Sequence, residues 1–158
     1  MKTLKKIGLA LLVVFVIAQF FGPDKNEGEL SSVDAFIADT NPPKDVKTIL
    51  TNTCFDCHSS YTRYPWYNNI TPVNYWMAEH VEDGSKHFNV SKWNDYSIKR
   101  KDHKLDELIE MVEAKEMPLP SYTWTHGDAK LSDAQITSVI TWAKQVRTKY
   151  AAQMVEPQ

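Results

Sequence analysis

The sequence predicts an all-α protein, and three observations lead to that prediction. Apolar residues recur at the three- and four-residue spacing of amphipathic helices from about residue 44 to residue 150. No stretch shows the two-residue alternation of a strand, and no internal repeat appears. The 158 residues suit one domain with a leader and a tail. Since the net charge is only −2 and no basic block is present, we expect no nucleic-acid partner.

The N-terminus predicts export. Three lysines, the last of them Lys6, precede an apolar run from Ile7 to Ala18. A cleaved leader should end in small residues, but Phe20-Phe21 follows the run, so we interpret the segment as an uncleaved single-pass anchor. The run is slightly shorter than the ~20 residues that span a bilayer. The lysines would hold this end in the cytoplasm, which predicts an inner-membrane protein with its main domain in the periplasm.

A first helix of the main domain is predicted over roughly residues 45–57. Val46 and Ile49 share one face by their spacing, and Cys54 continues that face. The residues before it, 23–43, are polar and lack a sustained period, so we expect a linker there.

Two further helices are predicted from their end signals. Thr71 suits the N-cap of the second helix and Pro72 its first position, and Gly84 would terminate it. The third covers about residues 102–115. It ends at the run 117–120, where two prolines remove backbone donors.

The last helix is predicted to begin at Ser132, because Gln135 three residues later completes a capping box. It should fray by about Tyr150. The expected organisation is a leader or anchor helix at 1–22, a linker at 23–43, a main domain at 44–150 and a flexible tail at 151–158.

The pattern C-x-x-C-H at residues 54–58 is the signature of covalent attachment of c-type haem. Positions i, i+3 and i+4 of a helix share one face, so Cys54, Cys57 and His58 point at the same object. The two thiols would form thioethers to the haem vinyl groups, and His58 would ligate the iron. One such motif predicts one covalent haem c.

Three other interpretations of the two cysteines are weaker. A structural zinc site needs four ligands, and a thioredoxin-like motif needs a βαβ context. A disulfide between Cys54 and Cys57 is compatible with export. None of these accounts for His58 directly after the second cysteine.

The second axial ligand of the iron decides the chemistry, because electron carriers fill that position while enzymes and sensors leave it open. Met117 is the favoured candidate, since it stands just past a helix end in a segment stiffened by Pro118 and Pro120. The alternatives are His126, His80 and His87.

Arg63 lies in an aromatic-rich loop that follows the motif. Because arginine binds carboxylates in a bidentate manner, Arg63 is a candidate contact for a haem propionate.

Several segments between residues 45 and 145 resemble a bacterial haem-binding domain family of cytochrome c-like proteins, and more broadly class I mono-haem cytochrome c. The resemblance implies covalent haem c and a membrane-tethered periplasmic domain. The aromatic loop after His58 is a departure from ordinary class I proteins. The matching pieces are Cys54-Phe55-Asp56-Cys57-His58-Ser59, Thr62-Arg63-Tyr64-Pro65-Trp66-Tyr67, Ile70-Thr71-Pro72, His80-Val81 with Gly84, Glu116-Met117-Pro118-Leu119 with Tyr122, and His126 with Ala129 and Leu131.

Two functions follow from this interpretation. The favoured one is an electron carrier whose haem iron is ligated by His58 and Met117, and which serves unidentified periplasmic or membrane redox partners. The alternative is a haem c enzyme or small-ligand sensor, peroxidase-like, with a displaceable sixth ligand. The carrier is favoured because no acid–base pair is placed by a recognisable motif, so catalysis is not expected.

Overall fold

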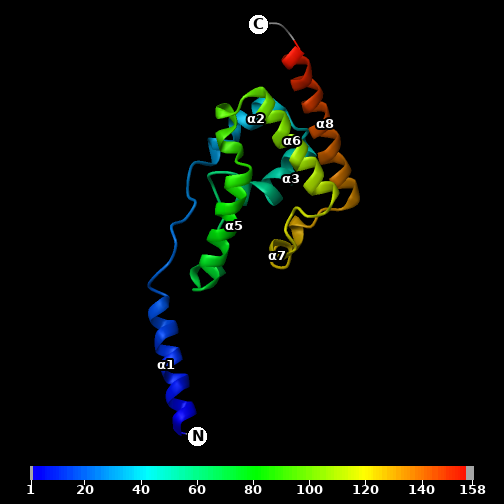
Figure 1. Ribbon diagram of the computed structural model, residues 1–158. Helices are drawn as coiled ribbons and strands as arrows, with labels where there is room; N and C mark the ends of the chain where they lie inside the picture. The colour runs from blue at the N-terminus through cyan, green and yellow to red at the C-terminus, as the bar shows by residue number, and fades with distance from the viewer. Residues whose placement is uncertain (1, 156–158) are drawn as a thin grey trace.

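The computed structural model describes residues 2–155, and the fold across them is helical, as the sequence predicts (Figure 1). Within this range the β-type pairing is limited to one antiparallel bridge between Glu27 and Tyr61. The elements, in chain order, are α1 (Lys2–Ala18), η1 (Leu30–Val33), α2 (Asp34–Thr40), α3 (Lys44–Ile49), the π-helical turn η2 (Leu50–Cys54), α4 (Phe55–His58), η3 (Trp66–Asn69), α5 (Val73–His87), η4 (Val90–Asp95), α6 (Ile98–Glu113), α7 (Pro120–Thr123), η5 (Gly127–Ala129) and α8 (Asp133–Val155).

The short helix α4 is held between longer ones. It packs against α5, while α6 packs along α8 and α3 also contacts α8. In Figure 1, α5 lies on one side of α3 and the α6–α8 pair lies on the other. The C-x-x-C-H motif is therefore carried on a short segment in the middle of the domain.

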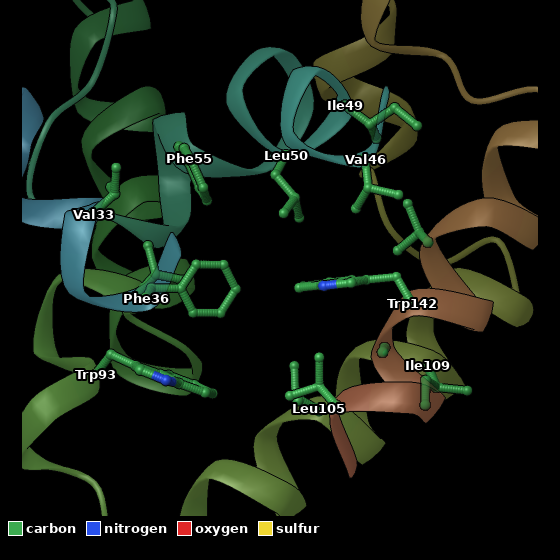
Figure 2. Close-up of a cluster of buried hydrophobic side chains, with 14 of the residues drawn as sticks. Val33, Phe36, Val46, Ile49, Leu50, Phe55, Trp93, Leu105, Ile109 and Trp142 are labelled. Carbon is green, nitrogen blue, oxygen red and sulfur yellow. The ribbon is translucent and has the colours of Figure 1, made fainter. Parts of the chain in front are cut away.

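The core centres on the fully buried ring of Phe36 in α2. Four aromatic rings meet it edge-on, with ring centroids 4.9 to 6.3 Å away: Phe55, Phe88, Trp93 and Trp142. Figure 2 shows Phe36 and Trp142 directed toward each other, with Phe55 and Trp93 on either side of Phe36. Such edge-to-face pairs are favourable beyond the area that they bury. Because Phe55 belongs to the C-x-x-C-H motif, the core fixes one side of that motif.

Residues 23–43 differ from the irregular linker expected there. They form η1 and α2, and they bury Val33, Phe36 and Thr40. A helix of seven residues is too short to show a sustained period, and its stability comes from tertiary packing. The domain boundaries themselves stay a prediction.

The helix predicted over residues 45–57 is confirmed, with an irregularity. From Lys44 to His58 the chain is helical, but η2 forms a π-helical turn that ends at Cys54. Single π turns inside helices are frequent at functional sites. Here the π-helical turn lies directly before α4, the helical turn that contains Cys57.

The second predicted helix is confirmed with different ends. α5 begins at Val73 with Pro72 as its N-cap, and the hydroxyl of Thr71 makes no capping hydrogen bond to the helix backbone. Gly84 lies inside α5, which runs to His87, so its predicted role as terminator is wrong. The physical reason is a close contact between two backbones, described with the site below.

The starts of α6 and α8 show how caps set helix boundaries. α6 begins earlier than predicted, at Ile98, because the side chain of Ser97 caps it by accepting from the Arg100 N–H at 3.3 Å. The predicted capping box of α8 is confirmed. Ser132 N–H donates to Gln135 Oε1 at 2.9 Å, and Gln135 N–H donates to Ser132 Oγ at 3.3 Å.

α8 does not fray at Tyr150, and it continues to Val155. The Tyr150 side chain is fully buried, and its hydroxyl donates to Asp39 Oδ2 at 2.8 Å. This contact holds the helix beyond the point where the sequence pattern weakens. Of the tail expected at 151–158, residues 156–158 lie outside the described residues.

α1 buries none of its residues, and it meets the domain at its C-terminal end. Gln19 makes two hydrogen bonds to the backbone of Thr71, donating to its carbonyl at 3.1 Å and accepting from its N–H at 3.0 Å. The Thr71 hydroxyl donates to the Phe21 carbonyl at 3.0 Å. Among the residues described, no helix combines the length and the apolar character that crossing a membrane requires, which differs from the expected anchor.

Asp39 joins four elements through its carboxylate. Oδ2 accepts from Trp93 Nε1 at 2.9 Å, from Lys101 Nζ at 2.8 Å and from the Tyr150 hydroxyl at 2.8 Å, and Oδ1 accepts from Lys149 Nζ at 2.9 Å. Burial alone would raise the pKa of Asp39, but these hydrogen bonds outweigh it and hold the pKa well below its usual range. The carboxylate ties α2 to η4, α6 and α8.

We expect Asp39→Asn to lower the free energy of unfolding by roughly 2–3 kcal/mol, because it removes the charge that four donors share. A carboxyl whose pKa is lowered by folding contributes stability above its unfolded pKa of about 3.9, and the contribution is lost as the pH falls below that value. Urea unfolding at pH 7 and at pH 3 measures both effects, and the gap between variant and wild type should narrow at pH 3.

Asp133→Asn is the control, since that carboxylate pairs with Lys115 on the exposed surface and solvent screens the pair. Equal stabilities for the Asp39 and Asp133 variants at pH 7 would contradict the structural role of Asp39.

Candidate haem-attachment site

The single turn of α4 separates the five motif residues into two groups. Phe55 and Asp56 are buried, with 5% and 6% of their surface exposed, and they fix the turn to the protein. Cys54 and Cys57 are partly exposed and carry free thiols. His58 closes the turn and is also only partly exposed. The turn therefore leaves the two thiols and the imidazole at the surface of the core, as covalent haem attachment requires.

His58 is held by two backbone carbonyls. Its Nδ1 lies 3.0 Å from the Gly84 carbonyl oxygen and 2.9 Å from that of Phe88. Because carbonyl oxygens only accept, the network assigns the proton to Nδ1 and leaves the Nε2 lone pair for a metal. Burial lowers the pKa of His58, outweighing the carbonyl hydrogen bonds that raise it, so the ring is neutral at pH 7. Metal-binding histidines are oriented by this kind of second hydrogen bond.

Gly84 brings α5 into contact with the motif. A Cβ at this position would lie 2.9 Å from the Cys57 carbonyl oxygen and 3.0 Å from the Cys57 Cβ. The next residue, Ser85, donates from its hydroxyl to the same Cys57 carbonyl at 3.1 Å. Glycine is thus needed for a close approach of two backbones, and the approach delivers the carbonyls that hold His58.

The two thiols are poorly ionised in the folded chain. Burial raises the pKa of Cys54 to about 12 and that of Cys57 to about 11, and the neighbouring charge of Asp56 acts in the same direction. Both groups are therefore neutral thiols at pH 7.

Asp56 lies between the two cysteines, and its carboxylate forms a bidentate ion pair with Arg63. Arg63 donates from Nε to Oδ1 and from an Nη to Oδ2, both at 2.9 Å. This pairing raises the pKa of Arg63. The predicted contact of Arg63 with a haem propionate stays a prediction, and it would share the guanidinium with Asp56.

A backbone turn after the motif is organised by Asn26. Its side-chain amide donates to the Ser59 carbonyl and to Thr62 Oγ1, both at 2.9 Å, and its backbone carbonyl accepts from the Thr62 N–H at 3.0 Å. Its own N–H donates to the Tyr64 hydroxyl at 2.7 Å. The segment before η1 thus closes over the chain that follows His58.

The segment that carries Met117 reaches the motif through Tyr122. Met117 is partly exposed just beyond α6, and its N–H donates to the Met111 carbonyl at 3.1 Å. Five residues later, the Tyr122 hydroxyl donates to Asp56 Oδ2 at 2.8 Å. Burial raises the pKa of Tyr122, and the charge of Asp56 raises it further. Ligation of iron by Met117 stays a prediction. The segment that carries Met117 is nevertheless hydrogen-bonded, through Tyr122, to the turn α4 that bears the C-x-x-C-H motif, which we call the attachment turn.

The alternative ligands occupy different surroundings. His126 stacks on Tyr122 with ring centroids 4.2 Å apart, and its Nε2 lies 3.4 Å from the Tyr67 hydroxyl. His80 lies on α5, where its Nδ1 is 2.8 Å from the Trp76 carbonyl oxygen. His87 is exposed at the end of α5. Among residues 2–155, no three His, Cys, Asp or Glu side chains form a cluster that could hold a metal ion by themselves.

The donor set fits haem c. Two free thiols stand three residues apart on a helical turn, and the adjacent imidazole presents Nε2. The haem-binding domain family matches residues 13–145, which include the motif, the loop with Arg63 and the segment with Met117.

The chain belongs to the haem-binding domain family. The match covers most of the 158 residues and confirms the family resemblance seen in the sequence. As a haem-binding domain the protein binds haem, while covalent attachment, the number of haems and each ligand stay predictions. No curated protein and no solved structure matches the chain.

Sequence reasoning missed two residues that shape this haem-binding domain. Asp56 occupies a position that the C-x-x-C-H pattern leaves open, so the pattern gives no signal for it. Gly84 has the appearance of a helix terminator, because a glycine needed for close approach and one needed at a helix end look alike in a sequence.

We expect Gly84→Ala to lower haem content and stability although alanine favours helices by up to about 1 kcal/mol. The added methyl group would push α5 away from Cys57, and the overpacking typically costs 1–3 kcal/mol, about enough to reverse the sign. The haem-to-protein ratio and the thermal midpoint of the purified protein measure the effect.

Gly127→Ala is the matched control, since nothing lies within 4 Å of a Cβ built there. If the two alanine variants keep the same haem content and the same midpoint, the close approach at Gly84 has no role in holding the site.

Proposed function

We propose that this haem-binding domain is a periplasmic, membrane-tethered mono-haem c-type cytochrome that transfers electrons between redox partners. Two thioethers from Cys54 and Cys57 hold one haem c, and His58 and Met117 ligate its iron. We infer a class I cytochrome c-like fold for this domain. This proposal deepens the haem binding that the family establishes.

One observation carries the proposal. The turn that bears both thiols also bears an imidazole whose Nδ1 is bonded to the carbonyls of Gly84 and Phe88. A ligand held from two sides keeps its position when the iron changes oxidation state, and this rigidity suits an electron carrier.

Membrane tethering rests on α1. Its apolar side chains are exposed, among them Leu9, Leu11 and Val14 at 63–65%. A soluble domain rarely exposes so continuous an apolar surface without a partner, and a bilayer interface is a suitable one. The lysines before the apolar run are typical of an exported leader, and this supports a periplasmic haem domain.

A visible spectrum of the purified holoprotein tests the function. An electron carrier with Met117 on the iron should show a weak sulfur-to-iron charge-transfer band in the far red when ferric, and should bind carbon monoxide poorly when ferrous. Rapid carbon monoxide binding together with no far-red band would favour a haem c enzyme or small-ligand sensor instead.

Met117→Ala should abolish the far-red band, lower the reduction potential and open the iron to carbon monoxide, because a thioether stabilises ferrous iron. Met117→His should restore six-coordination at a lower potential. Spectra and redox titration measure these changes after acid–acetone extraction has established that the haem remains attached. Unchanged spectrum and potential in Met117→Ala would move the ligand to another residue, with His126 and His80 the next to substitute.

The intact mass of the native protein, measured together with its partition between membrane and soluble fractions, checks the tether. The proposal expects an uncleaved chain in the membrane fraction, because bulky Phe20-Phe21 stands where a leader peptidase needs small residues. A soluble chain that begins near residue 22 would contradict the tether and leave export intact.

A further inference from the structure

Asp56 has both carboxylate oxygens engaged and is almost fully buried, with 6% of its surface exposed. Oδ1 accepts from the Arg63 backbone N–H at 3.1 Å and from its Nε at 2.9 Å, and Oδ2 accepts from an Arg63 Nη at 2.9 Å and from the Tyr122 hydroxyl at 2.8 Å. A buried carboxylate with four donors has one stable orientation. Asp56 is therefore a rigid acceptor within the attachment turn.

The position of this acceptor is set by the haem motif itself. Asp56 lies between Cys54 and Cys57 on α4, and its backbone carbonyl accepts from the Thr62 hydroxyl at 2.6 Å. Covalent haem at the two cysteines would fix the turn further. Any group bonded to the Asp56 carboxylate is thereby held at a constant position relative to the haem.

Tyr122 is hydrogen-bonded to this fixed carboxylate and connects it to residues 117–126. Within the described part of the chain, two sets of side-chain hydrogen bonds tie residues 117–126 to other segments. One is the bond from Tyr122 to Asp56, and the other joins the Tyr67 hydroxyl to Thr125 Oγ1 at 2.9 Å and to His126 Nε2 at 3.4 Å. The first is the stronger, because its acceptor is charged and buried and such bonds are roughly twice as strong as neutral ones.

Tyr122 also supports the rest of its segment. Its ring stacks on His126 at 4.2 Å with an interplanar angle of 14°. On the other side, four residues separate it from Met117, and two of them are prolines that restrict the backbone. A displacement of Tyr122 would be passed on to both candidate ligands of this segment.

We propose that Asp56 is a positioning residue that holds the sixth-ligand segment against the attachment turn through its hydrogen bond from Tyr122. This positioning role rests on the proposed function and assumes that the sixth ligand of the iron comes from residues 117–126. The bond shifts the equilibrium between ligand-on and ligand-off haem toward ligand-on, and its loss raises the fraction of open iron. Asp56 touches neither the iron nor a reacting atom, and it acts through Tyr122.

Tyr122→Phe is the sharpest test, because it keeps the ring that stacks on His126 and removes the donor to Asp56. In ferrous holoprotein the rate of carbon monoxide binding should rise about tenfold, which corresponds to 1.4 kcal/mol in the ligand equilibrium. The haem content should stay that of wild type, and the far-red band should weaken in ferric protein.

Tyr67→Phe is the matched control, since it removes a hydroxyl that is hydrogen-bonded to the same segment but not to Asp56. Its carbon monoxide rate should stay within about twofold of wild type. A rate in Tyr122→Phe equal to that in wild type, or an equal rise in both variants, would overturn the positioning role.

A double-mutant cycle isolates the bond. Asp56→Asn alone and Tyr122→Phe alone should each raise the rate of carbon monoxide binding. The double variant should show a smaller rise than the product of the two single effects, because both substitutions remove the same hydrogen bond. Multiplicative effects would assign the two residues to separate roles and overturn the proposal. If Asp56→Asn yields no holoprotein, the comparison of Tyr122→Phe with Tyr67→Phe decides the question.

The same spectra separate this inference from the proposed function. If Met117→Ala opens the iron and Tyr122→Phe does not, the positioning role fails while the ligand assignment stands. If neither Met117→Ala nor His126→Ala changes the spectrum, the sixth ligand lies outside the segment, and both the Met117 assignment and the positioning role are overturned.

Discussion

The carbonyl groups of Gly84 in α5 and of Phe88 just after it, which accept from His58 Nδ1, are the constraint on which the site depends. A helix end usually leaves its last carbonyls to solvent or to a cap. Here the Gly84 carbonyl and that of Phe88, just past the helix, meet the imidazole at 3.0 and 2.9 Å. The contact requires α5 to touch the backbone of Cys57, which a side chain at residue 84 would prevent. One absent methyl group thus permits the contact between helices that also orients the proposed iron ligand.

Around this contact, the attachment turn is supported from three directions. Phe55 packs on Phe36 in the core with ring centroids 6.2 Å apart, and Asp56 is bound by Arg63 and Tyr122. His58 is held by α5. The two residues that the C-x-x-C-H pattern leaves open therefore use their side chains to attach the turn to the protein, while the two thiols and the His58 Nε2 atom are left for haem.

The sequence predicts well whatever depends on local pattern. The all-α class, the helix through Cys54 and the capping box at Ser132 follow from spacing and cap chemistry, and the structure confirms them. Prediction from the sequence fails where long-range contacts decide whether a helix forms and where it ends. α2 is too short to show a period, yet Phe36 makes it the centre of the core. The extension of α8 past Tyr150 depends on Asp39, which is 111 residues away.

The residues of the site also divide into those that a local pattern identifies and those that depend on distant partners. The thiols and the imidazole can be found from a five-residue pattern, because their chemistry demands that spacing. Asp56 and Gly84 act through partners that lie 26 to 66 residues away, in Tyr122 and in His58, so no local pattern marks them.

The pairing of Asn26 with the turn after His58 also bears on the order of events during maturation. In the folded chain burial raises the pKa of both thiols well above its usual range, so they stay in the neutral form, which is a poor nucleophile. Asn26 closes over Ser59 and Thr62, and Tyr122 closes over Asp56. The proposed thioethers would therefore form on a nascent chain in which these closures are still open, and folding would then complete around a haem already in place.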